Sequence, residues 1–513
     1  MKKRRANGIH DGGRLGFEEQ LWRASDRLRG HVEPGEYKHI VLGLIFLKYI
    51  VDGHWHGAKP RGVLDRSKAC EVRVDLLGDA LSSGAPNEGP WHRIVEQTTV
   101  ENVHGLLRKA VRKTKQEHSE LSDLFDEGFV DIPPKPLVDL LRVIDDIPLE
   151  SHSTKSSDVL GRVYEYFLAH FASSEGRSGG EYYTPRSVVQ LLVDIIRPFR
   201  GKVYDPCCGT AGMFVQSERF VVEHGGCTAD VRLYGQESSA RTLRLAQINL
   251  ALRGLSADLG AVHADTFRND QHANLKADYV LANPPFNSKE WGASDLMSDR
   301  RWVFGVPPAG NANFAWVQHI YSRLSDDGVA GIVLSNGSLS SNQGGELEIR
   351  RKLIEADIIE CIVTLPSQLF YGTQIPACLW IISRSKQRGK AKHLKGRTLF
   401  IDARCMGHLV DRVHAELSAD ERTLISSTYH AWRASADHYV DSPGFAFSAT
   451  TNDVEQHRFA LVPGRYVGFP PSDCASWEQV LKEIDLGVAS RRLQEVQSAA
   501  DISLSALRML RRG

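Results

Sequence analysis

Between residues 151 and 400, short apolar stretches typical of strands alternate with longer stretches that have helical spacing. The strand-like stretches lie at residues 202–205, 231–237, 277–282, 328–334, 358–365 and 377–383. Parallel strands need a long crossover, usually a helix, so the alternation predicts an α/β fold with a mostly parallel sheet flanked by helices. Ligands of such open sheets bind beyond the carboxyl ends of the strands. A site is therefore expected among the residues that directly follow these stretches.

The stretch 277–282 is followed directly by Asn283, Pro284, Pro285 and Phe286. Neither proline has an N–H group to donate, so a central strand must end here. The carbonyl groups of Asn283 and Pro284 can accept both N–H bonds of an exocyclic amine on a planar ring, which frees its delocalised lone pair. Phe286 can stack on that ring. The four residues indicate methylation of such an amine; a strand-terminating loop with a buried phenylalanine is the alternative.

A turn of small residues follows Asp205, which ends the first strand-like stretch. Gly209, Thr210 and Ala211 lie in this turn, just before a helix-like stretch. Glycine lets a ligand approach the backbone, and the first turn of a helix offers N–H groups without partners. S-adenosylmethionine has no phosphate, so such amides and a carboxylate can bind its methionine end. These four residues are predicted to bind this cofactor, and a generic strand–helix turn is the alternative.

Two further acidic residues are predicted at strand ends. Glu237 ends the second stretch, where a carboxylate accepts hydrogen bonds from ribose hydroxyls in doubly wound nucleoside-binding folds. Residues 261–267 are predicted to form a third strand end, where Asp265 could accept from the adenine amino group of the cofactor. Each acid alone would be a solvated loop charge. Three acidic residues at successive predicted strand ends, followed by residues 283–286, favour a cofactor site.

A segment before these strands has the sequence Gly-Gly-Glu-Tyr-Tyr-Thr-Pro-Arg at residues 179–186. Thr184 suits a helix N-cap and Pro185 the first helical position. The tyrosines could pack against a cofactor, and the helix start could bind its carboxylate. A well-capped helix without a ligand is the alternative. The predicted cofactor-binding residues of this segment are Glu181, Tyr182, Tyr183, Thr184, Pro185 and Arg186.

Together these blocks resemble the modification subunit of type I restriction–modification systems, a DNA adenine-N6 methyltransferase. The resemblance rests on residues 179–185, 205–214, 235–237 and 283–286, with weaker support at 21–30, 160–168 and 365–376. It implies a Rossmann-like domain that binds S-adenosylmethionine and methylates adenine N6 in double-stranded DNA. It also implies a specificity subunit that binds two copies of this chain, and leaves open a restriction or translocase subunit. One departure is Thr-Ala at 210–211, where many relatives carry Ser-Gly.

Three regions are predicted along the chain. Residues 1–150 form a helical N-terminal domain, residues 151–400 the methyltransferase domain, and residues 401–513 a C-terminal region that ends in a helical tail. After residue 472, apolar residues recur near helical spacing, and a helix there must bury its apolar stripe. The resemblance implies docking of this tail on the specificity subunit; packing on the chain's own domain is the alternative.

Charge and cysteine content narrow the class of protein. Lys plus Arg and Asp plus Glu both number 63, which argues against a strongly basic DNA-binding protein that acts alone. The balance fits a subunit whose partner supplies part of the DNA contact, or a local basic face hidden in the total. The eight cysteines lack the paired spacing of a zinc site, so no metal is expected. Without a secretory signal or an apolar run of roughly 18 residues, a cytoplasmic protein with no membrane segment is expected.

Two other functions are open from the residues alone. Protein-glutamine N5 methyltransferases also use Asn-Pro-Pro and an aromatic residue to bind an amide, but the long helical N-terminal region counts against this class. A non-catalytic scaffold that binds S-adenosylmethionine is the other, and the intact Asn283 counts against it. Farther along, Arg350 and Arg351 lie on a helix-like stretch and indicate either a solvated face or phosphate contacts.

Overall fold

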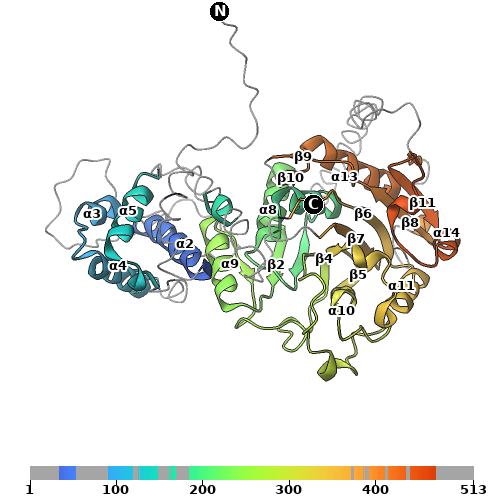
Figure 1. The fold of residues 1–513 in the computed structure, drawn as a ribbon, viewed down its shortest axis with the longest axis horizontal. Helices are drawn as coiled ribbons and strands as arrows, with labels where there is room; N and C mark the ends of the chain where they lie inside the picture. The colour runs from blue at the N-terminus through green and yellow to red at the C-terminus, as the bar shows by residue number, and fades with distance from the viewer. Residues whose placement is uncertain are drawn as a thin grey trace, which may run out of the picture. The chain divides into compact units, whose positions relative to one another are not determined.

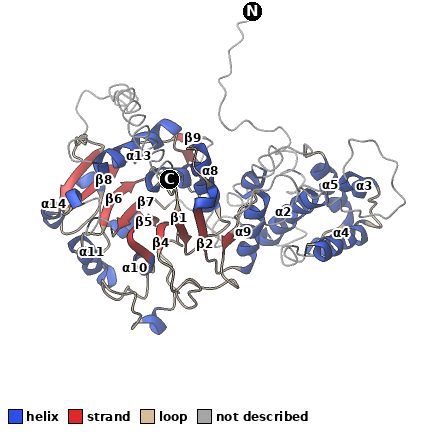
Figure 2. Ribbon diagram, turned by 180° about the vertical axis from the view of Figure 1, so that it is seen from behind, coloured by secondary structure: helices blue, strands red, loops and turns tan. Residues whose placement is uncertain are grey.

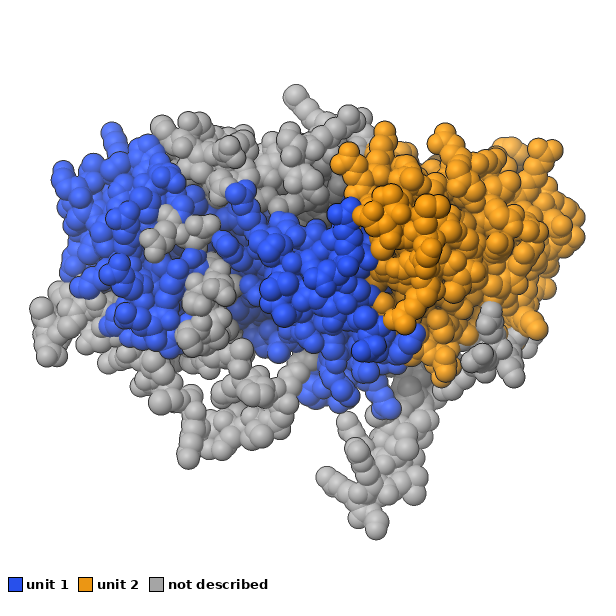
Figure 3. Space-filling model, turned by 90° about the horizontal axis from the view of Figure 1, so that it is seen from below, with its two compact units in different colours: residues 1–189, 198–285, 370–374 blue, residues 190–197, 286–369, 375–513 orange. Residues whose placement is uncertain are grey.

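The computed structural model describes residues 23, 34–52, 90–118, 125, 128–147, 161, 163–168, 184–370, 375–384, 386, 392–410, 414–434 and 439–469. The chain divides into two compact units, coloured separately in Figure 3. The first comprises residues 1–189, 198–285 and 370–374, and the second comprises residues 190–197, 286–369 and 375–513. Within the described ranges, no helix combines the length and apolar character needed to cross a membrane.

The first unit contains a helical region followed by alternating strands and helices (Figure 1). Its elements are α2 (Pro34–Val51), α3 (Pro90–Glu96), α4 (Val103–Glu117), η3 (Gly128–Asp131), α5 (Pro134–Asp145), β1 (Gly201–Asp205), α8 (Gly212–Glu223), η5 (Thr228–Asp230), β2 (Val231–Gly235), α9 (Ala240–Leu252), β3 (Ala257–Asp258) and β4 (Ala277–Ala282). Helix α7 (Arg186–Ile196) begins in the first unit and ends in the second.

The second unit continues the mixture of strands and helices. Its elements are η6 (Ala293–Leu296), α10 (Asn313–Arg323), β5 (Leu324–Ser335), η7 (Asn336–Leu339), η8 (Gln343–Gly345), α11 (Glu346–Glu355), β6 (Ile359–Thr364), β7 (Ala377–Ser383), η9 (Lys392–Leu394), β8 (Arg397–Asp402), β9 (His408–Leu409), β10 (Ala415–Glu416), α13 (Ala419–Ala434), β11 (Ala446–Thr450), α14 (Thr451–Gln456) and η11 (Pro463–Arg465).

Strand pairing confirms the α/β fold (Figure 2). In the first unit the strand order is β4-β1-β2-β3, and all three pairs are parallel. In the second unit the order is β11-β8-β6-β7-β5, where β6 and β8 are parallel and β7 is antiparallel to both of its neighbours. Every residue of β6 and β7 is buried. Burial of both faces explains why these two sequences are mostly apolar rather than alternating; Glu360 of β6 is a buried exception.

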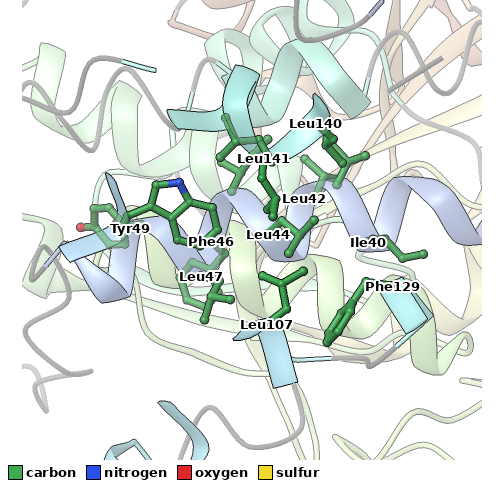
Figure 4. Close-up of a cluster of buried hydrophobic side chains, with 14 of the residues drawn as sticks. Ile40, Leu42, Leu44, Phe46, Leu47, Tyr49, Leu107, Phe129, Leu140 and Leu141 are labelled. Atoms are coloured by element: carbon green, nitrogen blue, oxygen red, sulfur yellow. The ribbon is translucent and has the colours of Figure 1, made fainter. Parts of the chain in front are cut away.

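The helical region of the first unit has its own hydrophobic core, built around α2 (Figure 4). Most side chains from residue 40 to residue 51 are buried, so α2 is a central helix rather than a surface one. Phe46 stacks on Phe125 with ring centroids 5.8 Å apart. The amine of Lys48, also buried, is paired with the carboxylates of Asp52 (3.3 Å) and Asp145 (3.7 Å). The cluster includes Leu245, Ile248 and Leu252 of α9, so this core continues onto the α/β part of the unit.

One strand prediction is wrong, and one predicted boundary falls inside a strand. Residues 261–267 form a loop, and the third strand is the shorter β3. Gly260 has a φ of 81° and Val262 is 54% exposed, so the backbone has already left the sheet. The predicted boundary at residue 400 lies within β8, which pairs with β11 in the same unit. The predicted tail helix after residue 472 lies outside the described residues.

Neither interpretation of Arg350 is correct. Its side chain is fully buried, and it donates to the carbonyls of Phe459 (2.8 Å) and Ser341 (2.6 Å). It therefore joins α11 to a segment 109 residues farther along the chain. Arg351, by contrast, lies on the exposed face and pairs with Glu348 and Glu355 of its own helix.

Candidate active site

The turn after β1 is held to the end of β2 by main-chain hydrogen bonds. The Gln236 amide donates to the carbonyl of Asp205 (3.1 Å), and the Cys208 amide donates to the carbonyl of Gln236 (2.9 Å). The Asp205 side chain is 2% exposed, and its Oδ1 accepts from the Cys207 amide at 3.0 Å. The predicted cofactor turn is thus a folded unit with a buried carboxyl group.

Two residues of this turn have left-handed backbone conformations: Gly209 with a φ of 53° and Ala211 with a φ of 65°. A Cβ atom on Gly209 would meet no atom within 4 Å, so open space lies beside the turn. Ala211 is buried, and a residue with a Cβ atom in this conformation costs roughly 1–2 kcal/mol. The Asn249 side chain on α9 donates to the Thr210 carbonyl (2.7 Å), which holds the turn in place. Ala211 thus adopts a conformation that glycine would adopt without this cost, in a turn held by Asn249.

Glu237 connects the end of β2 to the same turn. Its Oε2 accepts from the Gly209 amide (3.0 Å), and its Oε1 accepts from the Ser239 amide (2.8 Å) and the Ser238 hydroxyl (3.2 Å). Burial raises the pKa of this carboxyl group, and these hydrogen bonds oppose the rise. Each carboxylate oxygen has two lone pairs, so Oε2 can accept one further hydrogen bond, such as one from a hydroxyl.

The electrostatics of the turn suit a cationic ligand. Burial raises the pKa of Asp205 to about 7; the hydrogen bonds from Cys207 oppose this rise and the charge of Glu237 adds to it. Among the described residues, no positively charged group contributes to the pKa shifts of these two carboxyl groups. S-adenosylmethionine carries a sulfonium and an ammonium group, and its ribose supplies hydroxyl donors. The donor set and the open space beside Gly209 fit this cofactor.

Asp265 lies in the loop that replaces the predicted third strand. Its Oδ1 accepts from the amides of Phe267 (2.8 Å) and Arg268 (3.1 Å), so this oxygen stabilises a local turn. The neighbouring Ala264 amide donates to the carbonyl of Glu237 (2.8 Å). This bond brings the loop to the carboxyl end of β2 although no strand forms. Its role toward the cofactor adenine stays a prediction.

Asn283 directly follows β4 and is buried at 9% exposure. Its Nδ2 donates to the hydroxyl of Thr184 at 2.8 Å. This bond turns the other side of the amide away from Thr184, and Oδ1 is buried with no hydrogen-bond partner among the described residues. A buried carbonyl oxygen without a donor is the acceptor that an incoming amine requires.

Thr184 was predicted to be the N-cap and Pro185 the first helical residue, but the helix begins one residue later. Helix α7 begins at Arg186, and the Val189 amide donates to the carbonyl of Pro185 (3.1 Å), so Pro185 is the N-cap residue. Thr184 contacts Asn283 instead of capping the helix.

Glu181, Tyr182 and Tyr183 lie outside the described residues. Farther on, Pro284 is buried and Phe286 is 7% exposed.

Two structural features of the site were not predicted from the sequence. Asn249 contacts the predicted cofactor turn from α9, and Thr184 contacts Asn283. The available signal for Asn249 was a polar residue within the apolar stretch 243–252 of a helix whose neighbours are buried. No local pattern indicated the contact of Thr184, because its partner lies 99 residues away.

Comparison with known proteins identifies the family. Residues 155–473 match the N-6 DNA methylase family, and residues 17–144 match the HsdM N-terminal domain. The chain is 48% identical over 313 residues to the type I restriction enzyme HindI methylase subunit of Haemophilus influenzae, covering 61% of this chain and 69% of that protein. It is 33% identical over 482 residues to the MjaIX methylase subunit of Methanocaldococcus jannaschii, covering 89% and 85% of the two chains.

The fold is also found in a solved structure. The type I restriction-modification methyltransferase subunit from Streptococcus thermophilus superposes with a TM-score of 0.69 at 24% identity, over 88% of this chain and 99% of that one. The family match covers the cofactor turn, Glu237 and Asn283 together. The chain therefore belongs to the N-6 DNA methylase family, among the methylase subunits of type I restriction enzymes.

Proposed function

We propose that two copies of this chain act with one specificity subunit to methylate adenine N6 in double-stranded DNA. Membership of the family establishes the reaction class, an S-adenosylmethionine-dependent methyl transfer to adenine N6. Two parts of the proposal go beyond what family membership establishes. These are the double-stranded substrate and the ratio of two copies of this chain to one specificity subunit. The formal net charge of zero supports a partner that provides part of the DNA contact, because a DNA-binding protein that acts alone is usually basic.

The observation that carries the catalytic assignment is the buried, unpartnered Oδ1 of Asn283. We infer that it accepts one N–H of the adenine amino group while the Pro284 carbonyl accepts the other. Both bonds draw the nitrogen toward tetrahedral geometry, which makes its lone pair available for attack. Phe286, at the end of the same motif, supplies a face for stacking. A base in a duplex cannot reach such a site while stacked, so the adenine is flipped out.

The cofactor supplies a methyl group activated by a neighbouring sulfonium, so the leaving group needs no proton from the enzyme. The chain's contribution is orientation and exclusion of water. Asp205, Glu237 and the amides of the turn 209–211 would hold the cofactor, and Asn283 would orient the amine. Glu181, Tyr182, Tyr183, Arg186 and Asp265 are further proposed cofactor contacts.

The direct test is methyl transfer from isotope-labelled S-adenosylmethionine by the chain and its specificity subunit. Duplex DNA and a release-factor protein are offered as competing acceptors, and the labelled product is digested to nucleosides. We expect the label in N6-methyladenine. Label in protein glutamine, or none in DNA, would contradict the proposal.

Asn283→Ala provides the matched variant for this assay. Loss of one positioned polar contact in a transition state typically lowers the rate on the order of 100-fold or more. We expect methylation to fall by that factor while calorimetry shows unchanged cofactor affinity. A variant that methylates at the wild-type rate would remove Asn283 from the mechanism.

A further inference from the structure

The residue that follows Phe286 has a constrained backbone. Asn287 has a φ of 53°, in the left-handed region that residues with a Cβ atom rarely adopt and that asparagine tolerates best. Its amide donates to Oδ1 of Asn313 at 3.1 Å. In the opposite direction, Nδ2 of Asn313 donates to Oδ1 of Asn287 at 2.9 Å. The two residues therefore form a reciprocal pair that fixes both the main chain and the side chain of Asn287.

A third residue completes this group. The Ser335 hydroxyl donates to Oδ1 of Asn287 at 2.9 Å and lies 3.4 Å from Nδ2 of Asn313. Asn313 is the first residue of α10 and Ser335 is the last residue of β5; Asn313 is fully buried and Ser335 is 1% exposed. The Ala312 amide also donates to the carbonyl of Ser288 (2.9 Å). Rigid elements on two sides thus hold the chain at residues 287–288.

The bonding of Asn313 distinguishes positioning from direct contact with substrate. Its Oδ1 accepts from Asn287, and its two Nδ2 hydrogens have acceptors in Asn287 and Ser335. Its hydrogen-bonding donors are used within the protein, so the side chain is not available as a donor to a base. What the three residues do fix is the plane of the peptide bond between Phe286 and Asn287.

We infer that Asn313, assisted by Ser335, is a positioning residue for the methyl transfer, which it serves by setting the direction of the Phe286 ring. The inference rests on the proposed function, because it takes Phe286 as the face on which the flipped adenine stacks. The peptide plane after Phe286 sets its main-chain torsion, and this torsion sets where the ring points. Release of Asn287 from its left-handed conformation would turn the ring away from the base.

The test uses the chain in complex with its specificity subunit and a cognate duplex. Asn313→Asp keeps the shape and the acceptor for the Asn287 amide, but it removes both donors. Gln318→Glu is the matched control: Gln318 is a fully buried amide on the same helix, bonded to the Phe304 amide and the Gly305 carbonyl at 2.8 Å each. Asn287→Gly is the complementary variant, because glycine keeps the backbone conformation and removes the side chain.

Three measurements separate positioning from general stability. We expect Asn313→Asp to lower the single-turnover methylation rate roughly 100-fold, the effect of a misplacement of about 1 Å. Calorimetric affinity for S-adenosylmethionine should not change. Fluorescence of 2-aminopurine at the target position should increase, since a flipped base that is not stacked on an aromatic ring is less quenched. Gln318→Glu should leave the fluorescence at the wild-type level.

Each contrary result is decisive. Wild-type rate and fluorescence in both Asn313→Asp and Asn287→Gly would overturn the inference, as would equal fluorescence changes in Asn313→Asp and Gln318→Glu. If Asn313→Asp does not fold, Ser335→Ala removes a single donor and should give a smaller change in the same direction; an unchanged signal there overturns it too. Failure of the wild-type complex to form N6-methyladenine would instead contradict the proposed function.

Discussion

Single side chains in this protein perform their roles through partners that are distant in sequence. The Thr184 hydroxyl holds the amide of Asn283 across 99 residues, and the Asn249 amide holds the turn at Thr210 across 39. In both cases a buried polar atom with a definite partner determines the orientation of a functional group. Replacing such a partner should change the chemistry before it changes the fold.

The first prediction concerns Thr184→Val, which removes the hydroxyl and keeps the branched shape. The Asn283 amide loses its acceptor and can rotate, so we expect a lower maximal methylation rate with an unchanged Michaelis constant for S-adenosylmethionine. Thr184→Ser should restore the rate, because it restores the hydroxyl. A raised Michaelis constant with an unchanged maximal rate would mean that Thr184 binds the cofactor instead.

A second prediction at this scale concerns pH. The folded-state pKa of Asp205 is about 7, above its unfolded value of roughly 3.9. Between these values the folded protein binds a proton that the unfolded chain has lost, so the stability of the cofactor-free protein should decrease as pH rises through this window. The ionised carboxylate attracts the cationic cofactor, so affinity for S-adenosylmethionine should increase as pH rises through about 7.

Calorimetry at about one pH unit on either side of that value checks the binding half of this prediction. Thermal melting of the cofactor-free chain between about pH 4 and pH 7 checks the stability half. Asp205→Asn carries no titratable group at this position and should flatten both dependences. A wild-type protein whose affinity is independent of pH would show that Asp205 does not meet the positive charge.

Among the elements, α9 connects the helical region to the cofactor turn. Arg253, just after α9, donates to the carbonyl of Gly161 and to the carboxylate of Glu165, each at 2.8 Å, and also bonds Asn249. Asn249 in turn holds Thr210. A continuous series of hydrogen bonds therefore runs from Gly161 and Glu165 to the turn that carries Ala211.

The third prediction follows from this series. Asn249→Ala leaves the part-buried carbonyl of Thr210 without its donor, and loss of such a bond costs up to about 1–3 kcal/mol of free energy. If the turn relaxes, affinity for S-adenosylmethionine should fall by roughly 5- to 150-fold in calorimetry. Ser217→Ala is the control, because it removes a buried hydroxyl that bonds only Met213 in its own helix (2.7 Å). Equal losses in both variants would contradict a specific role for Asn249.

The sequence predicts an element well when the residues next to it determine its ends. It predicts poorly when a partner far along the chain determines the structure. The strands 277–282 and 377–383 were predicted with their observed bounds, because apolar runs with clear ends define them. The prediction for residues 261–267 was wrong because the left-handed Gly260 ends the strand early. Arg350 could not be placed from its helix, since one of its partners, Phe459, is 109 residues farther along the chain. Asp205, Glu237 and Asn283 were visible at strand ends, whereas their hydrogen-bond partners were not.

At the scale of the whole molecule, the described residues contain a buried core around α2 and an α/β sheet. We propose that docking on the specificity subunit uses residues other than these. The family match from residue 17 to 144 covers the helical region, and the match from residue 155 to 473 covers the sheet. Residues after 473 lie beyond both matches. They carry the apolar pattern that predicts a helix, and the family resemblance implies that this helix docks on the specificity subunit.

The last prediction tests that tail. Deletion of residues 474–513 should abolish or weaken the complex with the specificity subunit in size-exclusion chromatography. Calorimetric binding of S-adenosylmethionine should be retained, since the cofactor turn lies in another part of the chain. A complex of undiminished strength would mean that the tail packs on its own chain, the alternative that the sequence left open.

The carbonyl of Asn283, which has no hydrogen-bond partner among the described residues, has a consequence for evolution. A buried acceptor without a donor costs the free protein about 1–3 kcal/mol. Selection for stability alone would replace this residue by an apolar one of similar size. Under the proposed mechanism, its presence marks a trade-off in which part of the folding free energy is given up so that a substrate amine finds an acceptor already desolvated and aligned.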